Sequence, residues 1–540
     1  MIILGINAGV TVNQHDPAAA LVRDGELVCC VEEERLYRIK SPRGFLPIES
    51  IAACLKEAKI TMKDVDLVVL PGETYADLVE RTASYFRHHF GHAPKTRAIN
   101  HQLAHLASAF FQSGFDQATC ISYDAYGDRL SAALAIADRK KGITIQETRP
   151  FDNSLGHFYG TVTSFLGFYP GEDEYKVMGL APYAKAPADL SFFGQVAADG
   201  YHIDGQYIRR TPSPTFQEPF YTDKLVEKLG PPRRKDEPIT DRHRAIAGGA
   251  QVALEAMAIS LVTYYQSKTK LPNLCLAGGV ALNCSLNRYL RKLPFVGDFF
   301  VQPAASDRGL ALGCALQAAF EEGDGPKPVN HVFYGPSASA KKIEDAIALT
   351  GIPAVAVDDP SAAAAERIAQ GKIIGWYQGR SEFGPRALGH RSILANPAVA
   401  DMKDQINAKV KFREEFRPFA PSVLEEKAKT LYDMREASPY MTVAYDVHAP
   451  WNAKMPSTTH VNNTARVQTV ARATDPLFYE LIRGVEKETG CPAVLNTSFN
   501  IKGQPIVETP LDAISTFYGT GMDHLIMGNY LVSKPGAPRK

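Results

Sequence analysis

The sequence lacks an excess of charge of either sign. Its 59 Lys and Arg residues offset its 59 Asp and Glu residues, so the formal net charge is +0. A broad basic surface, which dominates binding to a phosphate backbone, is therefore not expected. We expect no nucleic acid among its partners.

The sequence also lacks a long apolar run. No stretch approaches the ~20 apolar residues that a membrane-spanning helix needs. The start MIILGINAGV has no basic region, with which a signal peptide would begin, and it reaches Asn7 almost at once. We therefore expect a soluble, cytoplasmic protein that binds no membrane.

Cysteine is present without any recognisable spacing. The 8 cysteines form no C-x-x-C pair, and only Cys29 and Cys30 lie close together in the sequence. Neither a disulfide framework nor a cysteine zinc site is indicated. Low-complexity tracts are missing as well, and 540 residues suffice for two to four domains with large cores.

The sequence contains one arrangement of predicted strands twice: a single strand, a loop and then a hairpin. Residues 2–7 predict a strand, and residues 18–34 predict a hairpin that turns at Asp24-Gly25. A strand that enters an acidic loop (120–129) and a second hairpin (131–148) repeat this order. Helical segments between and after them predict an α/β fold. Two related halves with such loops are typical of the actin-like ATPase fold.

A pair of histidines lies in the segment INHQLAHLASAFF, residues 99–111. His101 and His105 are four residues apart, so in a helix of ~3.6 residues per turn both imidazoles project from one face. Two neutral imidazoles at this spacing can bind one transition metal. The alternative is a buried helix whose histidines have other polar partners. Two ligands do not complete a metal site, so carboxylates must come from elsewhere.

A glycine pair stands in AGGVALN, residues 277–283. Gly278 and Gly279 would allow backbone amides to approach a ligand where a strand turns into a helix, whose N-terminus favours anions. A tight turn without a ligand explains the same pair.

Residues 321–339 are rich in Gly, Pro and Ser and predict a domain boundary, with domains at 1–335 and 336–540. Beyond this boundary, cations are interleaved with Gly, Pro and Phe in segments that we interpret as loops, which favours converging ligands for phosphate over a solvated surface. They are Arg380, Arg386, Arg391, Lys409, Lys411, Arg413 and Arg417. The polar residues 496–500 follow a short apolar strand and either cradle phosphate or cap a turn.

An ordered series of motifs resembles the O-carbamoyltransferases of antibiotic and nodulation-factor biosynthesis. The motifs are HDPAAALVRDGELVCCVEEERLYRIK, HQLAHLASAFF, KVMGLAPY, AGGVALN, PAASDRGLALG, GRSEFGPRALGHRS, RPFAPS and LNTSFN. The resemblance runs from Gly5 to about Tyr530. It implies a duplicated actin-like (Kae1-like) N-terminal domain, similar to the tRNA threonylcarbamoyl-transfer protein. It also implies an α+β YrdC-like C-terminal domain, similar to the adenylate-forming partner of that protein.

The resemblance implies a reaction in two steps. In the C-terminal domain, carbamoyl phosphate and ATP, with Mg²⁺, give carbamoyl adenylate. In the N-terminal domain, the carbamoyl group passes to a hydroxyl of a small-molecule acceptor, such as an antibiotic, a sugar or another secondary metabolite, and AMP leaves. Carbamate is a poor acyl donor, and its mixed anhydride with AMP supplies a stabilised leaving group.

The resemblance also implies roles for individual residues. The metal ligands would be His101, His105, Asp124 and Asp307. This donor set suits Fe(II), Mn(II) or Zn(II), and the resemblance favours iron. His15 would be the general base, for which imidazole is well matched. The N-terminal ligand site would use Lys40, Lys176, Gly278, Gly279 and Asn283. The C-terminal site would use Arg386, Lys411, Arg417, Arg466, Ser498 and Asn500.

Some members that modify amino sugars carry an acid two residues before this histidine, where the present chain has Asn13. A strongly cationic acceptor is therefore not expected. We expect the acceptor pocket to be built by segments without a recognisable motif, such as residues 184–240. A homo-oligomer is compatible with the sequence.

Three other functions are alternatives to carbamoyl transfer. A small-molecule kinase or ATPase of actin-like fold would leave the C-terminal cations unexplained. A non-catalytic, nucleotide-binding regulatory protein would not require His15 together with four metal ligands. The balanced charge weakens a role in tRNA modification.

Overall fold

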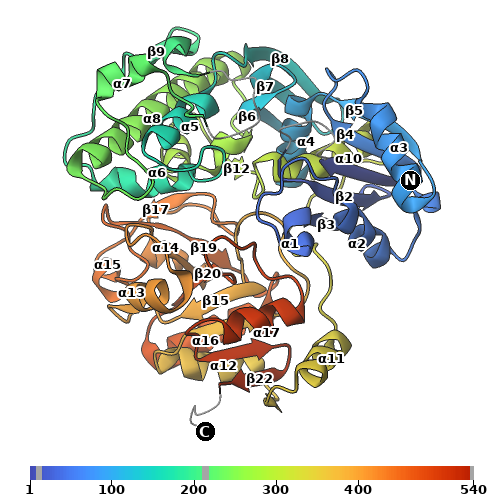
Figure 1. Cartoon of the computed structure of the whole chain (residues 1–540), viewed down its shortest axis with the longest axis vertical. Helices are drawn as coiled ribbons and strands as arrows, with labels where there is room; N and C mark the ends of the chain where they lie inside the picture. Colours follow the sequence, from blue (N-terminus) through green and yellow to red (C-terminus); the bar gives the residue numbers. More distant parts are fainter. Residues whose placement is uncertain (8–14, 210–217, 535–540) are drawn as a thin grey trace. The chain divides into compact units, whose positions relative to one another are not determined.

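The chain folds into two compact units in a computed structural model that describes residues 1–7, 15–209 and 218–534. The N-terminal unit comprises Met1–Glu32 and Ser41–Val329, and the C-terminal unit comprises Glu33–Lys40 and Asn330–Lys540. In Figure 1, the first unit runs from blue to yellow-green and most of the second from yellow to red. The chain thus changes unit at Val329, near the predicted boundary at residue 335. The assignment of residues 33–40 to the C-terminal unit was not predicted.

Two five-stranded sheets form the N-terminal unit, and they repeat one strand order. In each sheet the first strand pairs antiparallel with one strand of a hairpin on one side. On its other side it pairs with a parallel strand, and that strand pairs with a further parallel strand. The first sheet has the order β3 (Glu26–Glu32), β2 (Ala18–Arg23), β1 (Ile2–Asn7), β4 (Leu67–Pro71), β5 (Lys95–Ile99). The second has the order β8 (Gly142–Pro150), β7 (Leu130–Asp138), β6 (Gln117–Gly127), β11 (Leu274–Ala277), β12 (Phe299–Val301).

The predicted hairpins are present because their turn residues permit them. Asp24 and Gly25 both have a positive φ, 51° and 76°, as a two-residue turn of type I′ requires. β6 differs from the prediction, because the strand runs on to Gly127 instead of ending at Asp124. Its pairing with β7 becomes irregular between Tyr123 and Gly127, which leaves Asp124 in an irregular part of the strand.

Two helices pack closely against these sheets and each other. α10 (Leu310–Glu321) packs on β1, and α4 (His101–Ser113) packs on β6 and β11. Glycine permits both approaches: a Cβ on Gly5 would lie 2.0 Å from the Ala311 carbonyl oxygen, and one on Gly313 would lie 1.8 Å from that of Ala104. The start of α4, which carries both histidines, is thereby held against the second sheet.

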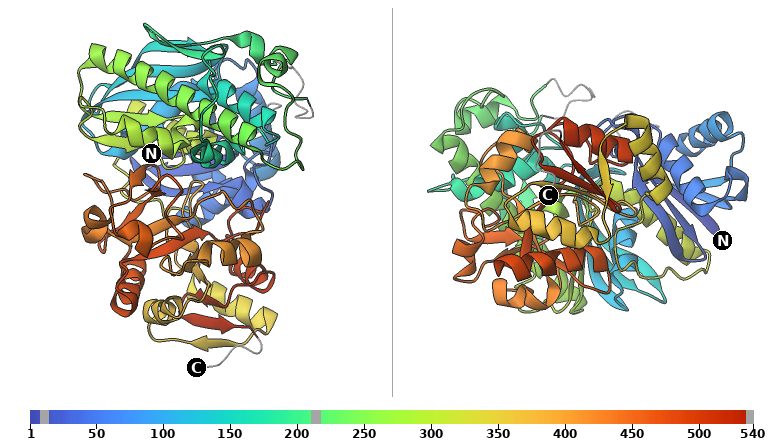
Figure 2. Two further views of the ribbon diagram at one scale, coloured as in Figure 1. Left: turned by 90° about the vertical axis from the view of Figure 1, so that its left-hand side faces the viewer. Right: turned by 90° about the horizontal axis from the view of Figure 1, so that it is seen from below.

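The remaining helices of this unit cover the sheets and a small two-stranded sheet. They are α2 (Ile48–Ala58), α3 (Leu78–Phe90), α5 (Leu155–Phe165), α6 (Glu174–Leu180), α7 (Asp223–Leu229), α8 (Asp241–Thr269) and α9 (Cys284–Leu290), and the small sheet pairs β9 (Gly194–Ala197) with β10 (Gly200–Ile203). Among the described residues, α8 alone is long and apolar enough by composition to span a membrane, but 61% of its most apolar window is buried. It packs on β9, β10 and α9, as a core helix does (Figure 2).

An eight-stranded mixed sheet is the centre of the C-terminal unit. Its order is β13 (Ala354–Ala356), β22 (Tyr530–Ser533), β21 (His524–Met527), β14 (Ile374–Tyr377), β15 (Arg391–Ala395), β20 (Ala493–Ser498), β16 (Ala420–Leu424), β19 (Gln468–Val470). β17 (Ala444–Asp446) and β18 (Thr464–Arg466) form a separate pair. The helices are α1 (Glu33–Tyr37), α11 (Ala340–Thr350), α12 (Pro360–Ala369), α13 (Met402–Ile406), α14 (Ala428–Leu431), α15 (Trp451–Lys454), α16 (Pro476–Thr489) and α17 (Pro510–Tyr518).

Apolar side chains cover both faces of this sheet, because neighbouring residues of a strand point to opposite sides. Trp376 and Ile526 join a buried cluster with α12 and α16. Tyr377 and Met527, the next residues of the same strands, join a second cluster with α11, α13 and α17. The chain therefore buries an extended core on each side of the sheet.

The prediction of a loop around Lys409 and Lys411 was wrong. Both lie in η6 (Asn407–Lys411), a π-helical turn that continues α13, and only at Phe412, with φ 47°, does the helix end. Such turns are rare and frequently occur at functional sites. Burial of Val410 in the core stabilises the turn. Lys409 and Lys411 flank Val410 in the sequence, so the sequence alone did not indicate that this residue is buried.

Candidate functional site

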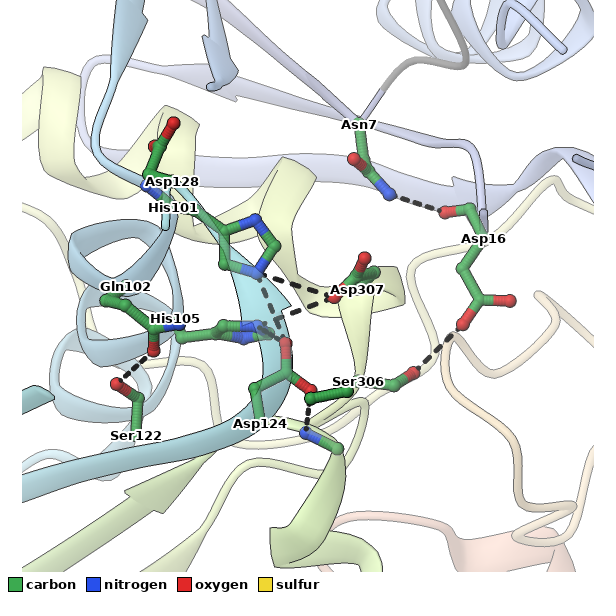
Figure 3. Close-up of polar contacts among 12 residues, drawn as sticks. Asn7, Asp16, His101, Gln102, His105, Ser122, Asp124, Asp128, Ser306 and Asp307 are labelled. Atoms are coloured by element: carbon green, nitrogen blue, oxygen red, sulfur yellow. Dashed lines mark hydrogen bonds and ion pairs between the residues drawn. The ribbon is translucent and has the colours of Figure 1, made fainter. Parts of the chain in front are cut away.

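The four predicted metal ligands converge in the N-terminal unit (Figure 3). His101 Nε2 lies 3.3 Å from Asp124 Oδ2 and 3.6 Å from Asp307 Oδ1. His105 Nε2 lies 3.3 Å and 3.5 Å from the same two oxygens. The side chains come from α4, from β6 and from η5 (Asp307–Gly309), three segments far apart in the sequence.

The spacing and chemistry of these atoms fit a transition metal. Ligands at ~2.0–2.1 Å from a tetrahedral ion lie about 3.3 Å from one another, which matches the distances above. His105 is 0% exposed, and His101 and Asp124 are each 8% exposed. Two imidazoles and two carboxylates suit iron, manganese or zinc, and the donor set alone does not distinguish these metals.

The local sequence orients His101 and the start of α4. The Asn100 side chain accepts from the amides of Gln102 and Leu103 and so caps the helix. The carboxylate of Asp128 accepts from the His101 amide at 2.7 Å. Gly127 makes room for the imidazole, since a Cβ there would lie 2.2 Å from the ring of His101.

Asp124 is oriented by the glycine pair. The Gly279 amide donates to Asp124 Oδ1 at 3.1 Å, which leaves Oδ2 to face the two histidines. Gly278 has φ 85°, and a Cβ on it would lie 2.3 Å from the Tyr123 carbonyl oxygen. The pair thus supports a predicted metal ligand. Its approach to a bound nucleotide stays a prediction.

Without a metal, protonated imidazole balances the two carboxylates of this cluster. Burial lowers the pKa of His105, but Asp124 and Asp307 outweigh it and raise the pKa to about 9. Burial likewise opposes ionisation of Asp124, but His101 and His105 hold its pKa well below the usual value. The two carboxylates therefore attract positive charge to the imidazoles, and a metal cation would replace the protons there.

His15 lies next to this cluster. Its Nε2 is 3.7 Å from Asp307 Oδ2, and its Nδ1 is 3.5 Å from Asp16 Oδ2. Burial alone would lower the pKa of His15, but Asp307 and Asp16 outweigh burial and raise the pKa to about 9. Asn7 donates to the carbonyl oxygens of His15 and Asp16, which fixes the backbone here. Asn13 lies outside the described residues.

Asp16 is itself paired, so it can orient His15. Arg308 Nη2 lies 3.2 Å from Asp16 Oδ1, and the Ser306 hydroxyl donates to Oδ2 at 3.2 Å. Arg308 also donates to the hydroxyl of Ser41 at 3.4 Å. The loop that carries Asp307 is therefore tied to the loop that carries His15.

Two other predicted ligands of this unit have partners within the protein. Lys176 Nζ donates to Asp173 Oδ2 at 2.8 Å. The Asn283 side chain accepts from the Leu286 amide and so caps α9, and it exchanges hydrogen bonds with Gln251. Neither contact requires a ligand.

A second cluster, in the C-terminal unit, is cationic. Lys411 is 4% exposed. Its Nζ donates to the Ser498 hydroxyl at 3.3 Å, to Asn500 Oδ1 at 2.7 Å and to the carbonyl oxygens of both residues. All four oxygens are neutral. Burial lowers the pKa of Lys411 well below its usual value, and Arg413, Arg417 and Lys40 lower it further.

Lys40 folds with the C-terminal cations, and its role in the N-terminal site stays a prediction. It lies in the segment that folds with the C-terminal unit, and its charge acts on Lys411. Of the other predicted cations, Arg417 pairs with Glu414 at 3.4 Å, while Arg386 and Arg466 are half-buried in the same unit. The structure thus joins Lys40, Lys411, Arg417, Ser498 and Asn500 in one neighbourhood.

A buried ionic network was missed by sequence reasoning. Arg35, 1% exposed, donates to the Gly384 carbonyl oxygen at 2.7 Å, and its charge acts on Glu382 and Glu508. Arg391, 0% exposed, lies 3.9 Å from Glu508 and 3.8 Å from the ring of Tyr377. The signal available was the charge density of EEERLYRIK after an apolar strand.

These observations describe a two-unit α/β protein in which one unit gathers four side chains that could hold a metal ion and the other gathers a cluster of cations. The model of the family described as carbamoyltransferase N-terminus matches residues 3–96 and 72–316, and that of the carbamoyltransferase C-terminus matches residues 365–534. The chain therefore belongs to the carbamoyltransferase family and is an enzyme that transfers carbamoyl groups.

Curated relatives agree over most of the chain. The nodulation protein NolNO of Sinorhizobium fredii is 39% identical and covers 96% of this chain, which spans 79% of it. The nodulation protein NolO of Bradyrhizobium diazoefficiens is 39% identical over 81% of this chain and 79% of its own length. A solved structure of full-length HypF, in a phosphate- and nucleotide-bound form, is 12% identical, covers 60% of this chain and 56% of that one, and has a TM-score of 0.39. This likeness is too weak to bear on function.

Proposed function

We propose that the enzyme is an ATP-dependent O-carbamoyltransferase that works in two steps. The C-terminal unit makes carbamoyl adenylate from carbamoyl phosphate and ATP. The N-terminal unit then transfers the carbamoyl group to a hydroxyl of a small-molecule acceptor and releases AMP. We further propose that the N-terminal unit is a duplicated actin-like (Kae1-like) domain and the C-terminal unit a YrdC-like domain.

The observation that carries the proposal is the cationic cluster around Lys411. Among the described residues, the buried Lys411 amine is held by four neutral oxygens and has no carboxylate partner, while Arg413, Arg417 and Lys40 act on it; its charged form would need a counter-charge there. Phosphate oxygens would supply this charge, and guanidinium groups are well shaped to bind them. Carbamoyl phosphate and ATP both carry phosphate groups, and the cations of this cluster would neutralise their negative charge.

Carbamoyl adenylate forms in the first step by way of carbamate. Water releases the phosphate of carbamoyl phosphate and leaves carbamate. An oxygen of carbamate attacks the α-phosphorus of ATP, the bond to the β-phosphate oxygen breaks, and pyrophosphate leaves. The cations stabilise the charge that gathers on the transferring and departing phosphate groups.

In the second step, residues of the N-terminal unit act on the acceptor. The acceptor oxygen attacks the carbamoyl carbon, and the bond from this carbon to the AMP phosphate oxygen breaks. His15 takes the proton from the acceptor hydroxyl in its neutral form, which a metal cation at Asp307 would favour by offsetting the carboxylate charge that raises the pKa of His15. Asp16 orients the imidazole through Nδ1. His101, His105, Asp124 and Asp307 would hold a metal, iron by preference, which would supply Lewis-acid chemistry to this step.

One assay tests the proposal. The protein is incubated with ATP, Mg²⁺ and carbamoyl phosphate, and the nucleotide products are separated. Pyrophosphate formation that requires carbamoyl phosphate supports the proposal. A kinase or ATPase would instead release ADP, and a regulatory protein would release neither product.

The acceptor, partners and location remain proposals of the same kind. We propose a hydroxylated secondary metabolite as acceptor and a cytoplasmic enzyme without nucleic-acid or membrane partners. Balanced charge supports the exclusion of nucleic acid.

A further inference from the structure

Tyr126 follows the proposed metal ligand Asp124 by two residues and contacts two other aromatic side chains, and none of the three has a part in the chemistry above. Tyr126 is 43% exposed and Phe151 is 37% exposed, and their rings meet edge to face with centroids 6.0 Å apart. Tyr75 is half-buried and shares a hydrogen bond with Tyr126. We refer to Tyr75, Tyr126 and Phe151 as the aromatic rim.

The backbone fixes the rim next to the proposed reaction site. Tyr126 follows the metal ligand Asp124 by two residues on β6. The loop that carries Tyr75 is anchored by Asp128, whose carboxylate accepts from the Glu73 amide at 3.1 Å and from the amide and hydroxyl of Thr74 at 3.0 Å and 2.8 Å. The same carboxylate holds the start of the helix that carries His101, so loop and metal ligands share one anchor.

The ring of Tyr75 is also held in place. It packs over Gly72, where a Cβ would lie 3.1 Å from its Cδ2. Burial, Tyr126 and the carboxylates of Asp128 and Asp307 raise the pKa of Tyr75 to about 12, so its phenol lies within reach of these carboxylate charges. The rim therefore combines two partly exposed ring faces with a fixed polar group near the carboxylates.

We propose that the aromatic rim is the acceptor subsite and binds the apolar face of a ring that carries the reacting hydroxyl. The inference rests on the proposed function and names its substrate class. Aromatic side chains bind flat apolar faces, and the tyrosine hydroxyl groups can orient polar substituents of the same ring. This chemistry fits the C–H face of a saturated sugar ring and the face of an aromatic alcohol. Residues 184–240, where we expected the acceptor pocket, supply none of the three side chains.

Binding and transfer are measured separately to test the subsite. Binding of methyl β-D-glucopyranoside, benzyl alcohol and glycerol to the full chain is followed by saturation-transfer NMR. Transfer to the same three alcohols from supplied carbamoyl adenylate is followed by AMP release and by the mass of the product. The variants are Tyr126→Ala, Tyr126→Phe and Phe151→Ala. Tyr85→Ala removes a tyrosine of similar exposure, 42%, from α3 and is the matched control.

We expect Tyr126→Ala and Phe151→Ala each to weaken binding of a ring alcohol about tenfold, the order of one aromatic contact. Tyr126→Phe and Tyr85→Ala should retain binding. Preference for the glucoside identifies a sugar ring, and preference for benzyl alcohol identifies an aromatic one. Equal effects on ring alcohols and glycerol, or no effect of either alanine, would overturn the subsite. Ring binding without transfer would contradict the proposed function and leave the subsite standing.

Discussion

The two candidate sites differ in the sign of the charge that surrounds their titratable groups. In the N-terminal unit, two carboxylates face two imidazoles, and the pKa of His105 rises to about 9. In the C-terminal unit, cations surround Lys411, and its pKa falls. The network of Arg35, Arg391, Glu382 and Glu508, by contrast, contains both signs and is balanced within the protein. We infer that a buried group whose neighbours carry charge of one sign marks a site for a ligand of the opposite charge. A buried network that contains both signs stabilises the fold instead.

The largest effect is expected at a metal ligand. His105→Ala removes one donor from a buried set of four, and we expect the bound metal and the transfer from supplied carbamoyl adenylate both to be lost. Substitutions that act only on the surroundings of a metal ligand already cost ~10–100-fold in affinity or activity. Metal analysis and single-turnover transfer measure the outcome. His88→Ala, an exposed histidine on α3, is the control, and full metal content in His105→Ala would refute the assignment.

A somewhat smaller effect is expected at the cationic cluster. Lys411→Met removes the ammonium from the proposed phosphate site and should slow pyrophosphate release more than ~100-fold, since two charge-assisted hydrogen bonds contribute ~1.5–3 kcal/mol each. The metal content should stay unchanged, because that site belongs to the other unit. Lys409→Met, an exposed lysine in the same π-helical turn, is the matched control. Normal pyrophosphate release in Lys411→Met would remove the main support for the first step.

His15→Asn should leave both clusters intact and affect the second step only. We expect metal binding and adenylate formation to persist, and transfer to be at least ~100-fold slower, the usual contribution of a general base. Single-turnover transfer from supplied carbamoyl adenylate measures this step. Unchanged transfer would assign His15 a structural role in orienting its loop.

Metal binding should release protons. Without metal, His105 has a pKa of about 9 and is largely protonated at pH 7.5, so a metal that binds its Nε2 must displace that proton. Calorimetric titration of the metal-free protein with Zn²⁺, in buffers of different ionisation enthalpy, should show net proton release. Net uptake would contradict the charge state inferred for the cluster.

Anion binding at the other site should do the reverse, with the smallest effect of the series. The pKa of Lys411 is lowered because burial and neighbouring cations disfavour its charge, so an added phosphate group should raise this pKa and cause proton uptake. The same calorimetric comparison with carbamoyl phosphate measures this uptake. Uptake that persists in Lys411→Met would mean that another group titrates.

The sequence predicted local features better than convergent ones. The turn at Asp24-Gly25 and the helix of His101 and His105 follow from neighbouring residues, and both are present. Asp124 and Asp307 were assigned through resemblance alone, because no local pattern shows that β6 and η5 meet at α4. That residues 33–40 fold with the C-terminal unit was not predicted for a similar reason, since tertiary packing decides which core this short segment joins.

The segment 33–40 has a consequence for how the protein can be taken apart. Because it folds with the C-terminal unit, the chain crosses between the units at 32/33, at 40/41 and at 329/330. A single cut near residue 330 would therefore not yield two complete halves. A fragment that starts there would lack Arg35, and Glu382 and Glu508 would lose one of their buried counter-charges. Because the chain passes between the units three times, no single cut of the backbone separates one complete unit from the other.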